Sequence, residues 1–369
     1  MKADKVYLEK KKIIFYLHLF LTVFFLLIMS YSFSSSLLEF IRLITGNSII
    51  VITLFCLFFY LSYFIFTLGL KIYDEFILRP KYAQPQQSFK QWRDRVLKKE
   101  IKIFCFFLFF SQVAYYFLES DTTTWWIPTA LICFFTYIFT DKFFWRYLTI
   151  MFYRKIDWAD ESRKEYLRSL AGKIGFSIND IVLLRDYKLK PQAMLVGFEP
   201  GRKLFINENS VQYAKEEIGV IFTREAAYHY YGYVWKFILI PAIAVFFGFY
   251  LVSVMFEKAA GIFKFEFLFY ISTVSVLLLL LFFVFLVFFL LSSVIKNNIE
   301  KTVDLFILQI TNAPDAFISV LIRETDLNIP EENFILSGFD FYLSTQKRIN
   351  IAQDYAQSML LREKRKNKQ

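Results

Sequence analysis

Long apolar runs constrain the fold of this chain more than any other feature. Phe alone accounts for 48 of its 369 residues, and the mean hydropathy is +0.43. A helix needs about 20 apolar residues to cross a hydrocarbon core of about 30 Å. Six runs approach or exceed this length, at residues 13–33, 49–70, 103–118, 125–139, 237–256 and 267–293. We therefore predict an α-helical polytopic membrane protein with about six transmembrane helices.

The distribution of positive charge predicts the orientation of these spans. Lys and Arg gather at residues 2–12, 71–99 and 362–368, whereas residues 34–48 and 119–124 carry little positive charge. By the positive-inside bias, both termini and the loop after the second span are expected in the cytoplasm. The net charge of +10 is accounted for by contact with anionic lipid, so no nucleic-acid partner is expected. The three cysteines all lie in apolar runs, which indicates neither disulfides nor a cysteine metal site.

The spans divide the chain into four regions. These are an N-terminal membrane region with four spans and a cytoplasmic loop at 71–100 (1–150), an insert (151–236), two further spans (237–293) and a helical C-terminal part (294–369). Apolar spacing in the two polar regions predicts helices at 161–174, 216–233, 315–324 and 346–362, and strands at 181–184, 194–197 and 203–206. We expect these elements to form a small cytoplasmic α+β domain.

The predicted helix at 216–233 carries the pattern of a zinc-peptidase helix whose metal ligands are replaced. Such a helix reads H-E-x-x-H, because two imidazoles four residues apart share a face and the glutamate activates the metal-bound water. Here the five positions are Arg224, Glu225, Ala226, Ala227 and Tyr228. The catalytic carboxylate is present. Arginine has no lone pair to give a metal, and tyrosine ligates only as the phenolate, from a pKa of about 10.

Seven segments, in order along the chain, carry a resemblance to a known family. They are residues 73–95, Trp125-Trp126, 170–176, 192–198 together with 202–206, 217–234, 299–304 and 344–349. Together they resemble the type-1 CAAX prenyl proteases, which are integral-membrane gluzincin zinc metallopeptidases. The resemblance identifies this chain as a degenerate member that lacks the zinc histidines, and it implies a gluzincin-like fold for the cytoplasmic domain.

The resemblance also implies roles for individual residues of the site. Glu225 matches the general base, and Arg224 and Tyr228 match the two histidine ligands. In the segment Ile299-Glu-Lys-Thr-Val-Asp304, Glu300 matches the third zinc ligand and Asp304 the carboxylate four residues later. The two acids are therefore kept where both imidazoles are absent.

Substrate binding is implied for a second set of residues. Gln192, Ala193 and Met194 match the start of a strand beside the active helix, and Arg348 matches the arginine of a later element. An extended strand in that place can pair with a peptide through backbone hydrogen bonds. The same segment is equally consistent with an ordinary strand of a small sheet.

We expect no zinc at this site, although zinc is the cofactor of the family. A divalent ion that is lost leaves inward-facing carboxylates uncompensated, at a cost of several kcal/mol. We therefore predict that the Arg224 guanidinium pairs with Glu300, and with Glu225 as well. Two alternatives stay open: Arg224 and Glu225 could form a solvated face, and Glu225, His229 and Glu300 could form an atypical metal site.

These observations favour a non-catalytic pseudopeptidase that binds the lipid bilayer and binds or regulates membrane or lipid-modified proteins. The first alternative is an active membrane metalloendopeptidase with an atypical metal site. A transporter or channel is the second alternative. Against it, residues 267–293 carry no charge, and no pair of helices is broken by Gly or Pro in corresponding places.

Overall fold

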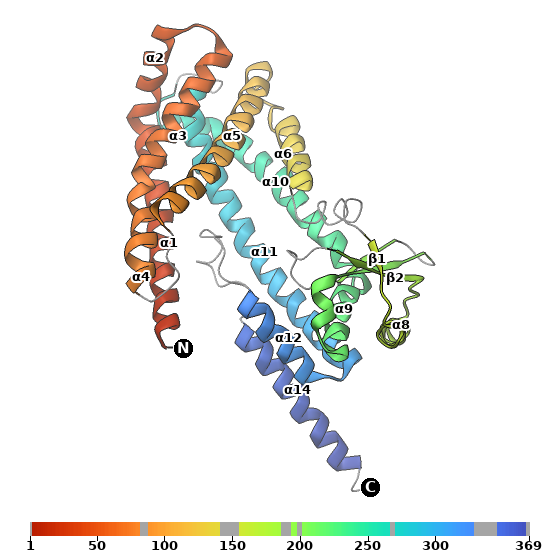
Figure 1. Cartoon of the computed structure of the whole chain (residues 1–369). Coiled ribbons are helices and arrows are strands. Elements are labelled where there is room, and N and C mark those ends of the chain that lie inside the picture. The colour runs from red at the N-terminus through yellow and green to blue at the C-terminus, as the bar shows by residue number, and fades with distance from the viewer. Residues whose placement is uncertain are drawn as a thin grey trace. The chain divides into compact units, whose positions relative to one another are not determined.

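A computed structural model describes residues 2–81, 88–140, 155–185, 193–197, 201–265, 270–327 and 345–366. These residues form two compact units (Figure 1). We call the first the membrane unit; its described residues fall within Met1–Tyr137 and Pro241–Leu290. We call the second the sheet unit; its described residues fall within Ile138–Ile240, 291–327 and 345–366.

Five helical stretches of the described chain are long and apolar enough to cross a membrane. They are Glu9–Tyr31, Ser48–Lys81, Phe89–Ser120, Ile238–Ile262 and Ile271–Thr311. They belong to the helices α1 (Lys2–Ile28), α3 (Ser48–Tyr73), α5 (Phe89–Ser120), α10 (Tyr233–Ile262) and α11 (Val274–Thr311). The prediction of a multi-pass membrane protein is thereby confirmed. The remaining predicted span lies on α6 (Trp126–Thr140), whose apolar part is shorter, so the count of six stays a prediction.

Short elements join the spans of the membrane unit. The π-helical η1 (Met29–Phe33) and α2 (Ser34–Ile44) follow α1, and η2 (Asp74–Leu78) and α4 (Arg79–Lys81) extend α3, so residues 71–81 continue a helix. Side chains fix two helix starts, because an N-terminal turn has unsatisfied backbone N–H groups. Asn47 accepts from the backbone of Ile49 and Ile50 before α3, and Ser88 with Gln91 forms a capping box before α5. Between the last two spans, η4 (Ile271–Thr273) leads into α11.

The helix α11 is much longer than a membrane is thick. Its 38 residues correspond to about 57 Å at a rise of about 1.5 Å per residue. The hydrocarbon core accounts for about 30 Å of that length. The apolar run of α11 ends near Ser293 and charged residues follow from Lys296, so we expect the C-terminal turns, which carry Glu300 and Asp304, to project beyond the hydrocarbon.

The sheet unit contains a mixed four-stranded sheet in the order β1-β2-β4-β3. Its strands are β1 (Lys155–Asp157), β2 (Asp180–Leu184), β3 (Ala193–Val196) and β4 (Lys203–Asn207). The strand β4 lies at the centre, parallel to β2 and antiparallel to β3. As a result β3 pairs with β4 on one side only and forms an edge of the described sheet.

In the described part of the sheet unit, four helices and the short η3 (Glu208–Gln212) accompany the sheet (Figure 1). These helices are α8 (Glu161–Ile174), α9 (Lys215–Tyr230), α12 (Pro314–Leu327) and α14 (Thr345–Lys366), and the end of α11 joins them. Their buried apolar side chains form one core with one face of the sheet, including Leu167, Leu195, Phe222 and Val303. Gly219 lets α9 approach α8, since a Cβ atom there would lie 2.8 Å from Cε1 of Tyr166.

The predicted elements of the sheet unit are largely confirmed. The helix at 161–174 coincides with α8, which Asp160 caps and which ends at Gly175 with φ +84°. The three predicted strands agree with β2, β3 and β4 to within one residue. The helix predicted at 216–233 is wrong at its end: α9 stops at Tyr230, and Gly232, with φ +63°, separates it from α10. The three-residue β1 has too short a pattern to have been predicted.

Candidate functional site

The helix α9 supplies the positions that match the metal-binding pentad. Residues four apart on a helix lie on one face, so Arg224 and Tyr228 point the same way. Ala226, on the opposite side of the helix, and Ala227 are buried in the core and hold the helix in place. At the start of α9, Glu217 accepts a hydrogen bond of 2.8 Å from the backbone N–H of Ala214. The helix is therefore fixed both by its core face and by its N-terminal cap.

The end of α11 supplies the two carboxylates that the sequence indicated. Glu300 and Asp304 are also four residues apart and share one face of that helix. The hydroxyl of Tyr228 donates a hydrogen bond to Oε1 of Glu300 at 2.6 Å. The position that matches the second histidine and the position that matches the third ligand thus contact each other directly, with the phenol proton between them.

Arg348 on α14 binds the second carboxylate. Its Nε lies 2.8 Å from Oδ2 of Asp304 and its Nη2 lies 2.5 Å from Oδ1, which is the bidentate geometry of a guanidinium on a carboxylate. The Asp304 side chain is 0% exposed, so this pair is fully removed from water on the acidic side. Nη2 of Arg348 is also 3.6 Å from Oε2 of Glu300. One arginine therefore contacts both acids of α11.

Arg224 pairs with an acid that the sequence analysis did not single out. Its Nη1 donates to Oε1 and Oε2 of Glu324 on α12, at 2.8 and 3.0 Å. The prediction that Arg224 pairs with Glu300 is wrong. The physical reason is that α11 ends at Thr311, the chain turns at Asn312 with φ +49°, and α12 then packs against α9 and brings Glu324 to the guanidinium. Glu300 meanwhile accepts from Tyr228.

Burial and neighbouring charges shift the pKa values of both α9 side chains. For Arg224, burial lowers the pKa, but the charges of Glu324 and Glu300 outweigh burial and raise it above its ordinary value. For Tyr228, burial raises the pKa, and the charge and hydrogen bond of Glu300 raise it further. The first side chain therefore stays cationic and the second stays a neutral phenol, so neither presents the lone pair or the phenolate that a metal requires.

Glu225, which matches the general base, has a histidine beside it. Oε1 of Glu225 is 3.7 Å from Nε2 of His229, one turn later on α9. Among the described residues no group of three or more His, Cys, Asp or Glu side chains could hold a metal. The alternative site of Glu225, His229 and Glu300 is therefore not assembled in this structure.

The residues predicted to bind substrate fall in different environments. Gln192 lies outside the described residues. Ala193 and Met194 belong to β3, and both side chains are buried, on opposite faces of the sheet. What β3 can offer a peptide is therefore backbone at its outer edge. Arg348 uses its guanidinium on Asp304 and Glu300, and its predicted role toward substrate stays a prediction.

Comparison with known proteins gives a structural neighbour. No protein-family model and no curated protein matches this sequence. The fold is similar to that of the crystal structure of S. mikatae Ste24p, with a TM-score of 0.57 and 14% sequence identity. The similarity covers 83% of this chain and 76% of that chain. Ste24p is a type-1 CAAX prenyl protease, the family that the seven sequence segments resemble. At this low identity the similarity establishes a Ste24p-like fold.

Proposed function

We propose that this chain is a membrane-embedded, non-catalytic homologue of the CAAX-type zinc peptidases. It would bind or regulate membrane or lipid-modified proteins from the cytoplasmic side. The Ste24p-like fold supports the homology. The cytoplasmic placement of the sheet unit is supported by the lysine- and arginine-rich segments at 2–12 and 71–99.

One observation carries the proposal: the side chains at all three positions that match the zinc ligands are engaged in contacts with other side chains. Arg224 is paired with Glu324, and Tyr228 donates to Glu300. A catalytic zinc site needs three protein donors and an open position for water. Here one position is a cation, one is a protonated phenol, and the third is the acceptor of that phenol. We infer that the site does not bind zinc.

A protein of this fold that has lost its metal can still bind a peptide. The outer edge of β3 offers backbone groups to an extended segment, and strand addition of this kind does not require a catalytic centre. A protein with this edge and with several membrane spans is suited to hold a membrane-attached peptide without cutting it.

One observation favours the enzyme as a second candidate. Glu225 keeps the position of the general base and has His229 at 3.7 Å. A histidine next to a carboxylate can serve in acid–base chemistry or bind a metal. On this reading the chain is an active metalloendopeptidase with an atypical metal site.

Metal content and cleavage distinguish the two candidates. The full chain is purified in mild detergent, its zinc is measured by elemental analysis, and cleavage of an unfolded test protein is followed with and without chelator. The pseudopeptidase predicts far less than one zinc per chain and no chelator-sensitive cleavage, with Glu225→Gln identical to the parent chain. Stoichiometric zinc, with cleavage that both chelator and Glu225→Gln abolish, would establish the enzyme.

The reverse change tests whether the rest of the site is still poised. In the double variant Arg224→His/Tyr228→His, Glu300 loses its phenol partner and the helix gains two imidazoles. We expect this variant to bind zinc and either single variant to bind none. If the double variant also fails to bind zinc, the site has changed beyond these two positions.

A further inference from the structure

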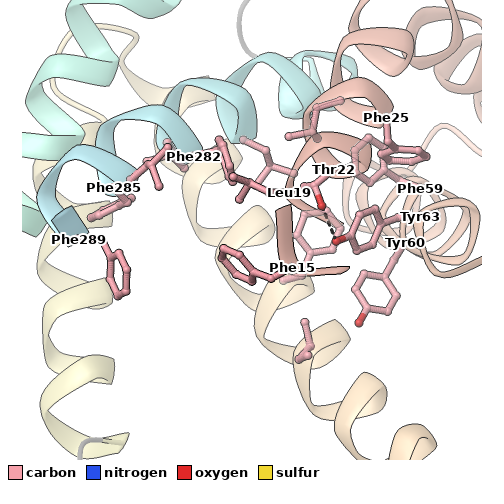
Figure 2. A pocket seen from close by; sticks show the side chains of 16 residues that line it. Phe15, Leu19, Thr22, Phe25, Phe59, Tyr60, Tyr63, Phe282, Phe285 and Phe289 are labelled. Carbon is pink, nitrogen blue, oxygen red and sulfur yellow. Dashed lines mark hydrogen bonds between the residues drawn. The ribbon is translucent and has the colours of Figure 1, made fainter. Parts of the chain in front are cut away.

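The membrane unit contains an open cavity that the proposed function does not use. Its volume is about 490 Å³, and helices α1, α3, α5 and α11 line it (Figure 2). Figure 2 shows Leu19 and Phe25 of α1 on one side, and Phe282 and Phe285 of α11 on the other. Nearly all the surface that faces the cavity is hydrocarbon. The size is within the range of about 300–1,000 Å³ that small-molecule sites have.

The few polar side chains of the lining are already satisfied. Thr22 bonds to the backbone oxygen of His18 at 2.9 Å and to the hydroxyl of Tyr63 at 3.1 Å, as Figure 2 shows for the latter pair. Tyr60 donates to Glu100 at 2.6 Å. A water molecule needs two to four polar partners to occupy a buried site. This lining offers few, so the occupant that fits is a hydrocarbon chain.

One end of the cavity is bordered by lysines. Phe15 and Ile103 line that end, and Lys12 and Lys99 each lie about one helical turn before them, on α1 and α5. Lys102 is next to Ile103 in sequence. Lys99 and Lys102 are exposed.

Two acids near this end, Glu100 and Glu75, are engaged inside the membrane unit. Glu100 binds Lys71 at 2.7 Å, and Glu75 binds Arg95 at 3.0 Å. Both acids are buried. The exposed lysines of α5 therefore provide a surplus of positive charge at the end of a hydrocarbon cavity.

We propose that this cavity binds one acyl chain of an anionic membrane phospholipid, whose phosphate lies against Lys99 and Lys102. The lining selects the hydrocarbon and the lysines select the negative headgroup. Each Lys near a membrane surface contributes about 1 kcal/mol of attraction to anionic lipid, which corresponds to about fivefold in binding. This inference does not depend on the site in the sheet unit.

Photo-cross-linking in vesicles tests the acyl chain. The full chain is reconstituted with a small amount of phosphatidylserine that carries a diazirine in one acyl tail, and the labelled peptides are mapped by mass spectrometry. We expect label on the α1 and α11 segments around Leu19 and Phe282. The variant Leu19→Trp, which places a larger side chain in the cavity, should lower this label by about tenfold, because the indole and an acyl chain cannot occupy the same space. The matched control is Leu61→Trp on α3, where the residue is 44% exposed and does not line the cavity.

A second pair of variants tests the headgroup. Lys99→Gln/Lys102→Gln should weaken labelling by phosphatidylserine by about fivefold for each lysine, and leave labelling by a phosphatidylcholine probe nearly unchanged. Lys90→Gln, near the start of the same helix, is the control. Equal labelling by the two probes, insensitive to the lysines, would overturn the assignment of an anionic lipid.

Two further outcomes also decide the proposal. Labelling that is the same in Leu19→Trp and Leu61→Trp would overturn the cavity as the site. Displacement of the label by a free farnesyl chain, but not by unlabelled phosphatidylserine, would replace the acyl chain by an isoprenoid. Leu281→Trp on α11 blocks the same cavity from another helix. If Leu19→Trp does not give a monodisperse, cooperatively melting protein, Leu281→Trp takes its place. The proposal then requires that Leu281→Trp lower the label relative to Leu61→Trp.

Discussion

Replacing Arg348 by methionine should release α14 from the end of α11. Methionine keeps an unbranched stem beside Phe317, whose ring centre is 5.8 Å from the Arg348 guanidinium carbon, but it removes the charge. Asp304, which is 0% exposed and receives two hydrogen bonds from Arg348, is then left buried without its cation. Breaking one side of a buried ion pair costs about 3–5 kcal/mol. Because Arg348 is only 13% exposed, we apply this value without reduction for solvent.

Adding a substitution at Asp304 shows whether the lost stability comes from the buried carboxylate that has no cation. In Arg348→Met/Asp304→Leu both charged groups are replaced by apolar ones, which is often neutral for a buried pair. We expect the double variant to regain most of the lost stability. The control is Lys203→Met, since Lys203 pairs with Asp180 at 3.8 Å on the surface of the same unit. Exposed pairs of this kind contribute about 0–1 kcal/mol.

Amide hydrogen exchange of the reconstituted full chain measures this effect locally. Opening of α14 is read from the protection of its own amides, with the amides of α8 as the internal reference in the same unit. The single variant should lower the opening free energy of α14 by about 3–5 kcal/mol. A loss below about 1 kcal/mol, the level of an exposed pair, would refute the role assigned to Arg348. A double variant no more stable than the single one would refute the stranded carboxylate as the cause.

Two further predictions concern α9. Gly219→Ala should lower the stability of the sheet unit by about 1–3 kcal/mol, because its Cβ would lie 2.8 Å from the Tyr166 ring. The control is Gly172→Ala on α8, where an added Cβ would have no atom within 4 Å and should raise stability by up to about 1 kcal/mol. Equal melting temperatures of the Gly219→Ala and Gly172→Ala variants would contradict the packing argument. The pKa of Tyr228 is raised by burial and by Glu300, so its hydrogen bond stabilises fully below the ordinary pKa of about 10 and is lost as pH rises through the raised pKa. The melting-temperature difference between the parent chain and Tyr228→Phe should stay constant up to about pH 9 and shrink above that; shrinkage below pH 8 would contradict it.

Local signals in the sequence were sufficient for most elements of the sheet unit. The helix α8 was predictable because Asp160 caps its start and Gly175, with φ +84°, ends it. The strands β2 and β4 were predictable because each is a short apolar run that is buried in the core. The end of α9 was not predictable in the same way, because Tyr231 is followed by Gly232, which ends the helix although the aromatic pattern continues into α10.

The candidate site was predictable residue by residue but not contact by contact. Spacing along one helix shows that Arg224 and Tyr228 share a face, and that Glu300 and Asp304 share another. It does not show which distant helix each face meets. That depends on the turn at Asn312 and on the packing of α12 against α9, which place a residue 100 positions away at the guanidinium. No motif in the chain marked Glu324.

The presence of Glu324 changes what histidine restoration should do. In Arg224→His/Tyr228→His, Glu324 loses the guanidinium that it binds on α9, and its side chain is only 25% exposed. A partly buried carboxylate without its partner costs about 1–3 kcal/mol. Without metal, the triple variant that adds Glu324→Gln should therefore melt at a higher temperature than the double variant. With zinc, the difference in melting temperature between the triple and the double variant should become smaller or change sign. The reason is that the ion supplies the positive charge that Glu324 lacks in the double variant. If Glu324→Gln has no effect on the melting temperature in either condition, the Arg224–Glu324 pair does not compensate for the missing metal.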